Sequence, residues 1–175
     1  YIINFVTNYN KENFIMMRFI SQEFRTTLFL KFFGFLKVPM IFYCNPKVIS
    51  ISESSVEIKI SLKRKTKNHV GSMYFGALSV GADITGGAIA LDLIKKSKCK
   101  INLLFKDFKA DFLKRAEGDV HFICNDGKII SDMVKETEIS KKRINKPIAI
   151  TAYVPTKFKE EPVAKFILTL SLKAY

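Results

Sequence analysis

The stretch from residue 72 to residue 96 constrains the fold most, because it has the length of a long helix and an unusual number of glycines. It contains Gly76, Gly81, Gly86 and Gly87. A glycine inside a helix costs roughly 1 kcal/mol relative to alanine. Such a helix is expected only where other parts of the chain must pack closely around it. The stretch therefore predicts a central helix wrapped by a sheet.

The segments on either side of this helix predict the sheet. Residues 56–63 alternate strictly between apolar and polar side chains, which is the period of a half-buried strand. Residues 48–51 precede this strand across a serine-rich turn. After the helix we expect about five antiparallel strands, at residues 100–113, 118–124, 128–140, 146–154 and 164–175.

Two connections between these strands have their own signals. The sequence NDGK at residues 125–128 predicts a hairpin, because Asp-Gly suits the tight primed turns. The sequence PTKFKEEP at residues 155–162 predicts a loop. The resulting order favours an α+β fold in which one curled antiparallel β-sheet wraps around a long central α-helix, with an extra N-terminal helix.

The N-terminal region predicts a helix over residues 11–37. Its large apolar residues recur at spacings of three and four, at Phe19, Phe24, Leu28, Phe32 and Phe35. Lys31 and Lys37 interrupt the apolar run and Pro39 ends it, so no uncharged run reaches the ~18 residues of a membrane-spanning helix. We therefore expect an amphipathic helix and no transmembrane segment, with contact at a membrane surface as one option.

The charge and the cysteines limit the class of protein. A net charge of +13 favours polyanionic partners, namely nucleic acid, anionic membrane, phosphate-bearing cofactors or an acidic carrier protein, or else a solvated lysine-rich surface. Nucleic acid is not expected, because no RNA-binding aromatic–basic run or zinc-finger pattern is present. The three cysteines are widely spaced, which argues against disulfides and a zinc site and favours a reducing cytoplasm. The two histidines lie far apart, so no metal site is expected.

The start of the central helix contains a recognisable motif in the sequence NHVGSMYFGALSVGAD, residues 68–83, which has no Lys or Arg. It resembles hotdog-fold thioesterases of the phenylacetyl-CoA-degradation type, which place Asn, Gly and His-Gly-Gly before an Asp or Glu inside the helix. Asn68, Gly71, Gly76 and Asp83 fall at the matching offsets. Tyr74 stands in place of the motif histidine, and Phe75 stands in place of the first glycine of the pair.

The resemblance extends over residues 48–174 and includes the run FLKRAEGDV at residues 112–120. This run is similar to the strand and turn where the family has Tyr-x-x-Pro-Ala and Gly-Asp. The resemblance implies a hotdog fold. We accordingly divide the chain into an N-terminal helical extension, residues 1–46, and a hotdog domain, residues 47–175.

Thioester chemistry assigns expected roles to the motif residues. A helix N-terminus offers unpaired N–H groups, so Gly76 or Phe75 is the expected donor to an oxyanion. Asp83 lies on the same helix stripe as Gly76, and apolar surroundings would raise its pKa toward the range of a general base. Alternatively, Asp83 is a solvated helix residue or is paired with a lysine.

By resemblance, Asp83 is the base or nucleophile and Asn68 orients the water or the carbonyl. Gly71, Tyr74 and Phe75 are expected to contact substrate, although Tyr74 is also compatible with simple packing. A plain turn is the alternative for Asn68.

The resemblance implies an acyl-CoA or acyl-carrier-protein thioesterase, and the cysteine usage favours a cytoplasmic location. It would need no cofactor beyond its coenzyme A thioester substrate, and it would form a homodimer or a dimer of dimers with sites between subunits. The basic clusters at residues 62–67 and 140–146 suit the phosphates of coenzyme A or an acidic carrier. Two alternatives stay open. One is a non-catalytic acyl-CoA-binding or regulatory hotdog protein, favoured if Phe75 blocks the carbonyl. The other is a hotdog dehydratase, which needs a histidine near Tyr74.

Overall fold

The computed structural model describes residues 21–175, so Phe19 and the first part of the predicted helix at residues 11–37 lie outside the described residues. The described chain forms, in order, α3 (Gln22–Leu36), α4 (Pro39–Cys44), β1 (Lys47–Ile51), β2 (Val56–Ile60), α5 (Phe75–Lys96), β3 (Ile101–Phe112), β4 (Val120–Cys124), α6 (Gly127–Ser140), β5 (Ile144–Tyr153), α7 (Pro155–Phe158) and β6 (Pro162–Ala174).

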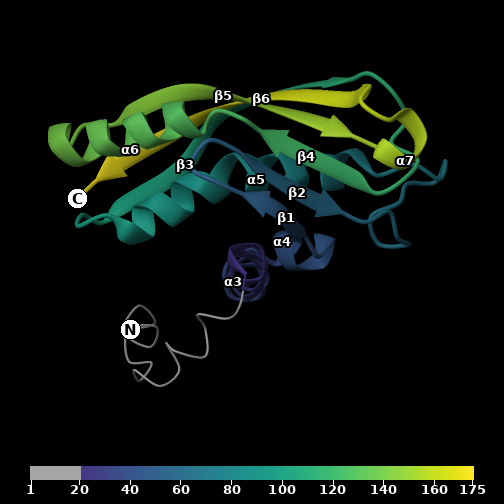
Figure 1. The fold of residues 1–175 in the computed structure, drawn as a ribbon, viewed down its shortest axis with the longest axis horizontal. Coiled ribbons are helices and arrows are strands. Elements are labelled where there is room, and N and C mark those ends of the chain that lie inside the picture. The colour runs from purple at the N-terminus through teal and green to yellow at the C-terminus, as the bar shows by residue number, and fades with distance from the viewer. Residues whose placement is uncertain (1–20) are drawn as a thin grey trace.

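The strands form one antiparallel six-stranded sheet in the order β1-β2-β4-β5-β6-β3. The sheet curls over α5, whereas α3 and α4 lie together beneath the rest of the molecule (Figure 1). This arrangement confirms the predicted α+β fold with a curled sheet around a long helix. It leaves β1 and β3 at the two edges, and β3 pairs only with β6 within the described chain.

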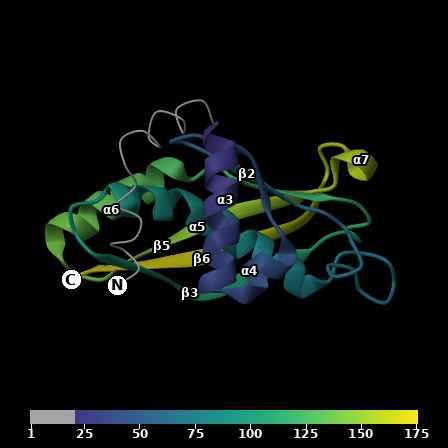
Figure 2. The ribbon, with the colours of Figure 1, turned by 90° about the horizontal axis from the view of Figure 1, so that it is seen from below.

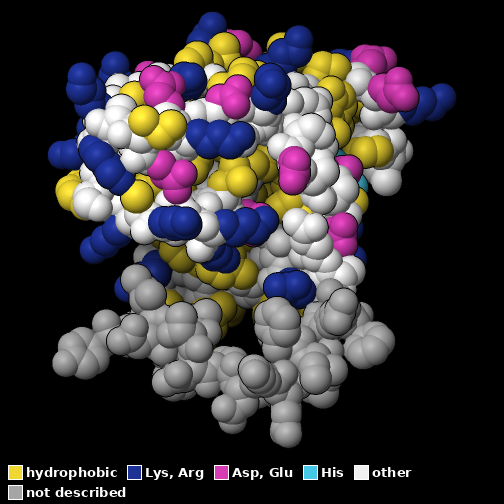
Figure 3. Space-filling view, turned by 60° about the vertical axis from the view of Figure 1, so that its left-hand side comes forward, with side chains coloured by type: hydrophobic (Ala, Val, Ile, Leu, Met, Phe, Trp, Pro, Cys, Tyr) yellow, Lys and Arg dark blue, Asp and Glu magenta, His cyan; other side chains and the backbone are white. Residues whose placement is uncertain are grey.

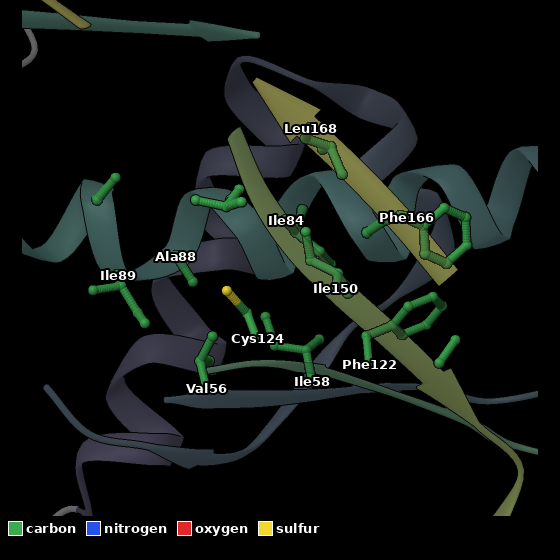
Figure 4. Packing of buried hydrophobic residues seen from close by; sticks show 14 of the residues in the cluster. Val56, Ile58, Ile84, Ala88, Ile89, Phe122, Cys124, Ile150, Phe166 and Leu168 are labelled. Carbon is green, nitrogen blue, oxygen red and sulfur yellow. The ribbon is translucent and has the colours of Figure 1, made fainter. Parts of the chain in front are cut away.

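The glycines of α5 make room for the side chains of the sheet. A methyl group at Gly81 would overlap the ring of Phe122, which comes from β4. One at Gly86 would lie 2.8 Å from the Cδ1 atom of Ile148 on β5. Figure 4 shows side chains of the sheet, including Phe122, gathered against α5. The predicted close approach is confirmed, although side chains rather than backbone fill the space.

Within the described residues, α5 has the length and apolar composition of a membrane span. However, 61% of its most apolar window is buried inside the fold. Burial of this extent is what the core helix of a folded domain requires, because the sheet already covers the apolar side chains.

The predicted hairpin at NDGK is wrong, because residues 127–140 form helix α6. The buried residues of α6 follow the helical spacing of three and four, at Ile130, Met133, Val134 and Thr137. Gly127 donates its N–H to the carbonyl of Ser54 at 3.0 Å, and a Cβ there would overlap the backbone of the β1–β2 turn. The glycine is therefore needed for close packing of a helix start and not for a primed turn.

Other boundaries differ in smaller ways. Four strands rather than five follow α5, and the predicted loop at residues 155–162 begins with the short helix α7. The helix expected up to Pro39 is confirmed over Gln22–Leu36, and a second helix begins at Pro39. The buried side of α3 holds Thr27, Leu30 and Gly34. The apolar stripe that predicted this helix, at Phe24, Leu28, Phe32 and Phe35, is on its exposed side.

Candidate functional site

Two backbone hydrogen bonds position the start of α5. The N–H of Met73 donates to the carbonyl of Ala116 at 2.8 Å, and the N–H of Tyr74 donates to the carbonyl of Thr66 at 2.8 Å. Ala116 belongs to the 112–120 run, so the two parts of the sequence motif meet at the start of this helix. The loop and the turn together hold the first residues of α5 in place.

The backbone N–H groups of the first two residues of α5 are unpaired within residues 21–175, and we call them the free amides. The N–H groups of Ala77 and Leu78 both donate to the carbonyl of Tyr74, at 2.9 and 3.1 Å. No side chain caps the helix, and the N–H groups of Phe75 and Gly76 have no acceptor among residues 21–175. Unpaired amides at the positive end of a helix dipole can stabilise an oxyanion.

Asp83 lies two turns further along α5 and is half-buried. Burial raises the pKa of its carboxyl to about 6. Within residues 21–175 the carboxylate accepts no hydrogen bond and forms no ion pair, so the alternative of a lysine partner is not met there. A carboxyl with this pKa can accept a proton near neutral pH.

Asp83 and the free amides do not meet within one chain. Gly76 and Asp83 are seven residues apart on one helix, which corresponds to about 10.5 Å along its axis at 1.5 Å per residue. A base and an oxyanion donor that act on the same carbonyl both need to be within hydrogen-bond reach of the reacting group. One chain therefore supplies both kinds of group at separate places.

Asn68 has the contacts of a turn residue. Its Oδ1 accepts from the N–H groups of Val70 and Ser72, each at 3.1 Å, and its Nδ2 donates to the Oγ of Ser72 at 3.0 Å. Gly71 follows with a φ of 87°, a conformation that favours glycine. Both residues shape the loop before α5, and neither has a hydrogen bond to Asp83 in the described structure.

Two aromatic rings flank the free amides. The ring centroids of Tyr74 and Phe75 are 4.7 Å apart, and the side chains are 48% and 59% exposed. A Cβ on Gly76 would lie 2.6 Å from Cε1 of Tyr74, so this glycine leaves space for the tyrosine ring beside the helix start. The two exposed rings lie beside the free amides, at the positions where the motif has histidine and glycine.

Asp119 had no expected role, and it lies in the turn at the end of the 112–120 run, directly before β4. Its carboxylate accepts from the N–H of Leu62 at 2.9 Å, from Nζ of Lys59 at 3.1 Å and from Oγ of Ser61 at 3.1 Å. Burial would raise the pKa of Asp119, but these hydrogen bonds and the lysine charge outweigh it and lower the pKa. The Gly-Asp pair of the motif was the sequence signal that could have identified Asp119. Its hydrogen bonds hold the end of β2 against this turn.

A cavity of about 520 Å³ lies apart from these residues, between α3 and the second half of α5. Arg25 and Phe29 line one side, and Asp92 and Lys95 line the other. Burial lowers the pKa of Lys95 to about 8, although Asp92 favours its charged form. Within residues 21–175 no group of three or more His, Cys, Asp or Glu side chains could hold a metal ion.

Solved structures resemble this fold over most of their length. A protein of unknown function from Pseudomonas aeruginosa, described as a probable thioesterase, has a TM-score of 0.67 at 20% identity, covering 85% of this chain and 96% of that one. A protein of unknown function from Chlorobaculum tepidum has a TM-score of 0.73 at 12% identity, covering 87% and 97%. A thioesterase from Haemophilus influenzae has a TM-score of 0.58 at 15% identity, covering 77% and 82%.

At these identities the likeness concerns the fold, and it confirms the hotdog fold that the motif implies. No curated protein matches this chain. Residues 25–164 match the family described as a domain of unknown function, DUF4442, from within α3 to within β6. This match covers most of the sequence, and the chain therefore belongs to the DUF4442 family.

Proposed function

We propose that the protein hydrolyses an acyl thioester, with Asp83 as the general base and the N–H groups of Phe75 and Gly76 as donors to the oxyanion. The observation that supports this most is the half-buried carboxyl of Asp83, which has no partner within residues 21–175 and whose pKa burial raises to about 6. Its helix begins with two free amides. The similar solved protein from Haemophilus influenzae is named a thioesterase and that from Pseudomonas aeruginosa a probable thioesterase, which supports the same reaction class.

The proposed reaction uses these groups in a fixed order. Asp83 accepts a proton from a water molecule as the water oxygen attacks the thioester carbonyl. The carbonyl oxygen becomes negative and accepts hydrogen bonds from the free amides. When the tetrahedral intermediate collapses, the carbon–sulfur bond breaks. The proton held by Asp83 passes to the leaving thiolate, and the products are a carboxylic acid and a thiol.

The site is proposed to form between two copies of the chain, because the two groups lie about 10.5 Å apart along one helix. Two α5 helices that cross antiparallel near Ser79 and Val80 would bring Asp83 of one copy to the free amides of the other. Both crossing residues are partly exposed in a single copy. The edge strand β3 exposes Phe108 and Phe112, at 43% and 50%, which supports pairing of this edge with a second copy.

The substrate is proposed to have an anionic carrier, either coenzyme A or an acidic carrier protein. Lys63, Arg64, Lys65 and Lys67 lie in the loop that leads to the start of α5, are exposed, and form no ion pair with residues 21–175. In the second basic cluster, by contrast, Lys146 pairs with Glu136 at 3.1 Å and Arg143 donates to Ser171 at 2.8 Å. The loop before α5 is therefore the preferred surface for phosphates.

Thiol release from acyl-CoAs of increasing chain length tests the proposal. We expect Asp83→Asn to lower the rate by about 100-fold or more, the usual contribution of a general base. Asp92→Asn is the matched control, since Asp92 lies on the same helix but pairs with Lys96 at 2.7 Å. Equal rates for wild type and Asp83→Asn would contradict the assigned role of Asp83.

A second function is favoured by one observation, the phenylalanine at position 75 beside the free amides. If its ring keeps the carbonyl away from the helix start, the protein binds acyl-CoA without hydrolysing it. Calorimetric binding of acyl-CoA without thiol release at any chain length would support that function. Hydrolysis by the wild type would exclude it.

A further inference from the structure

The outer side of α3 and α4 is a continuous apolar surface. On α3, Phe24, Leu28, Phe32 and Phe35 recur every three or four residues, and each is at least 55% exposed. Phe42 and Tyr43 of α4 are 47% and 51% exposed, and the rings of Phe35 and Phe42 are 5.4 Å apart. We call these six residues the α3–α4 face.

The packing of the two helices holds this face in place. A Cβ on Gly34 would lie 2.6 Å from the backbone N of Phe42, so this glycine allows α4 to pack closely against α3. The opposite side of α3 is anchored to the sheet, because Thr27 Oγ1 accepts the N–H of Val48 on β1 at 2.9 Å and Leu30 is only 1% exposed. Figure 2 shows α3 lying across the side of the molecule, next to α4. The phenylalanines of the face therefore point outward on a fixed support.

Basic residues are close in sequence to those of the face. Residues 24–52 include Arg25, Lys31, Lys37 and Lys47 and contain no Asp or Glu. None of these four forms an ion pair with residues 21–175. Lys65, from the basic loop before α5, lies 5.2 Å above the Tyr43 ring. Lys and Arg side chains are also spread over the surface shown in Figure 3.

We propose that the α3–α4 face binds to the surface of an anionic lipid bilayer, with α3 lying in the plane of the interface. The aromatic and leucine side chains enter the boundary between headgroups and acyl chains, and Arg25, Lys31 and Lys37 reach the anionic headgroups. A second copy of the chain fits the face poorly. It would bring Arg25, Lys31 and Lys37 of both copies together, and Glu23 is the one acidic residue of α3 that could balance them.

Co-sedimentation of the full chain with phosphatidylcholine vesicles, with and without about 30% phosphatidylserine, tests this proposal. We expect binding to the anionic vesicles that weakens at about 1 M salt. Leu28→Ser combined with Phe32→Ser should weaken it by about tenfold or more. Ile139→Ser is the matched control, because Ile139 is 85% exposed on α6, away from the face. Absence of binding to anionic vesicles, or equal loss in the control, would overturn the proposal.

A charge series separates specific docking from adsorption of a basic protein. Replacing Arg25, Lys31 and Lys37 with Gln should weaken vesicle binding more than replacing Lys128, Lys135 and Lys142, which are exposed on and beside α6. Both triple variants remove the same number of positive charges. Equal loss in the two would show attraction by net charge alone and would overturn the assignment of the face.

A fluorescent reporter locates the contact directly, because the chain has no Trp. Phe32→Trp should shift its emission to the blue on anionic vesicles and be quenched by brominated lipid, whereas Ile139→Trp should not change. Light scattering of the Leu28→Ser, Phe32→Ser variant gives the remaining test. If the variant has a lower molecular mass than the wild type and neither protein binds vesicles, the face joins two copies of the chain. That result would overturn the proposal. None of these results depends on thioester hydrolysis.

Discussion

Replacement of Asp83 by Asn changes how the stability of the protein depends on pH. Burial raises the pKa of this carboxyl from 3.8 to about 6. One pKa unit corresponds to 1.36 kcal/mol, so the difference amounts to roughly 3 kcal/mol between the protonated and charged forms. Because the pKa of Asp83 is higher in the folded state than in the unfolded chain, the protonated carboxyl favours the folded state. Its contribution to the free energy of unfolding is fully present below about pH 4 and is lost as the pH rises through about 6. An asparagine side chain at this position cannot ionise, so the variant keeps its stability over the same range.

Urea unfolding of wild type and Asp83→Asn at a series of pH values from about 4 to 8 measures this effect. The other carboxyl groups are common to both proteins and cancel in the difference between the two free energies of unfolding. We expect this difference to shift by roughly 3 kcal/mol in favour of the variant between about pH 4 and pH 7. Protein concentration must be constant if the chain dimerises. A difference that stays the same at all pH values would refute the burial of an unpaired carboxyl at this position.

The remaining predictions concern folding stability. Asp119→Asn should behave in the opposite way, because the pKa of Asp119 is lowered in the folded state. The wild type should have the higher free energy of unfolding at neutral pH, and this difference should disappear as the pH falls below about 4. The same urea titration measures it. Gly87→Ala should raise the stability by up to about 1 kcal/mol, since the nearest atom of another described element to the new Cβ is Cζ of Phe105, at 3.8 Å. Gly81→Ala should lower it by roughly 1–3 kcal/mol through overlap with the Phe122 ring, and thermal unfolding compares the two. Gly127→Ala should destabilise by a similar roughly 1–3 kcal/mol, since its Cβ meets backbone, and unchanged thermal midpoints would contradict these packing arguments.

The fold could be predicted from the sequence because its strongest signals are local. Glycines spaced along residues 72–96 indicated a closely packed helix, and the alternation at residues 56–63 indicated a half-buried strand. The hairpin at residues 125–128 failed because Asp-Gly also occurs where a helix start must approach another segment. That segment is the turn at Ser54, seventy-three positions earlier than Gly127, and no local pattern reveals such a contact.

The orientation of α3 could not be predicted either. The spacing of Phe24, Leu28, Phe32 and Phe35 identifies a helix, and an apolar stripe normally faces the core. Here the buried side is made of Thr27, Leu30 and Gly34, because α3 packs against β1 and α4 through small and medium side chains. A helix that is apolar on both sides does not reveal from sequence which side is covered.

The surroundings of Asp83 were predicted from the sequence, whereas the roles of Asp83, Asn68 and Gly76 stay predictions. The neutral stretch before Asp83 correctly indicated apolar surroundings and a raised pKa. The hydrogen bonds of Asn68 are local to its own turn, as the alternative interpretation of that residue expected. The distance between Asp83 and Gly76 follows from helix geometry, and it is this distance that makes a second copy necessary for the proposed reaction.

A proline at position 75 provides a clean test of the helix-start amide. Phe75 is the first residue of α5, where proline is well tolerated and where the N–H has no acceptor among the described residues. Tyr74 before it has φ −63° and ψ 137°, which suits the residue that precedes a proline. Phe75→Pro therefore removes one N–H donor, whereas Phe75→Ala removes the ring and keeps the donor. We expect hydrolysis to fall by about 100-fold only in the proline variant.

The most direct test of the central claim is thioester hydrolysis by a purified heterodimer of one Asp83→Asn chain and one Phe75→Pro chain, isolated with two different tags. Each homodimer should be nearly inactive. In the heterodimer, the intact Asp83 of one chain faces the intact amide of the other, so one of the two sites is complete and about half of the wild-type activity per dimer should return. A heterodimer as inactive as both homodimers would contradict a site shared between Asp83 and the helix start of a second copy.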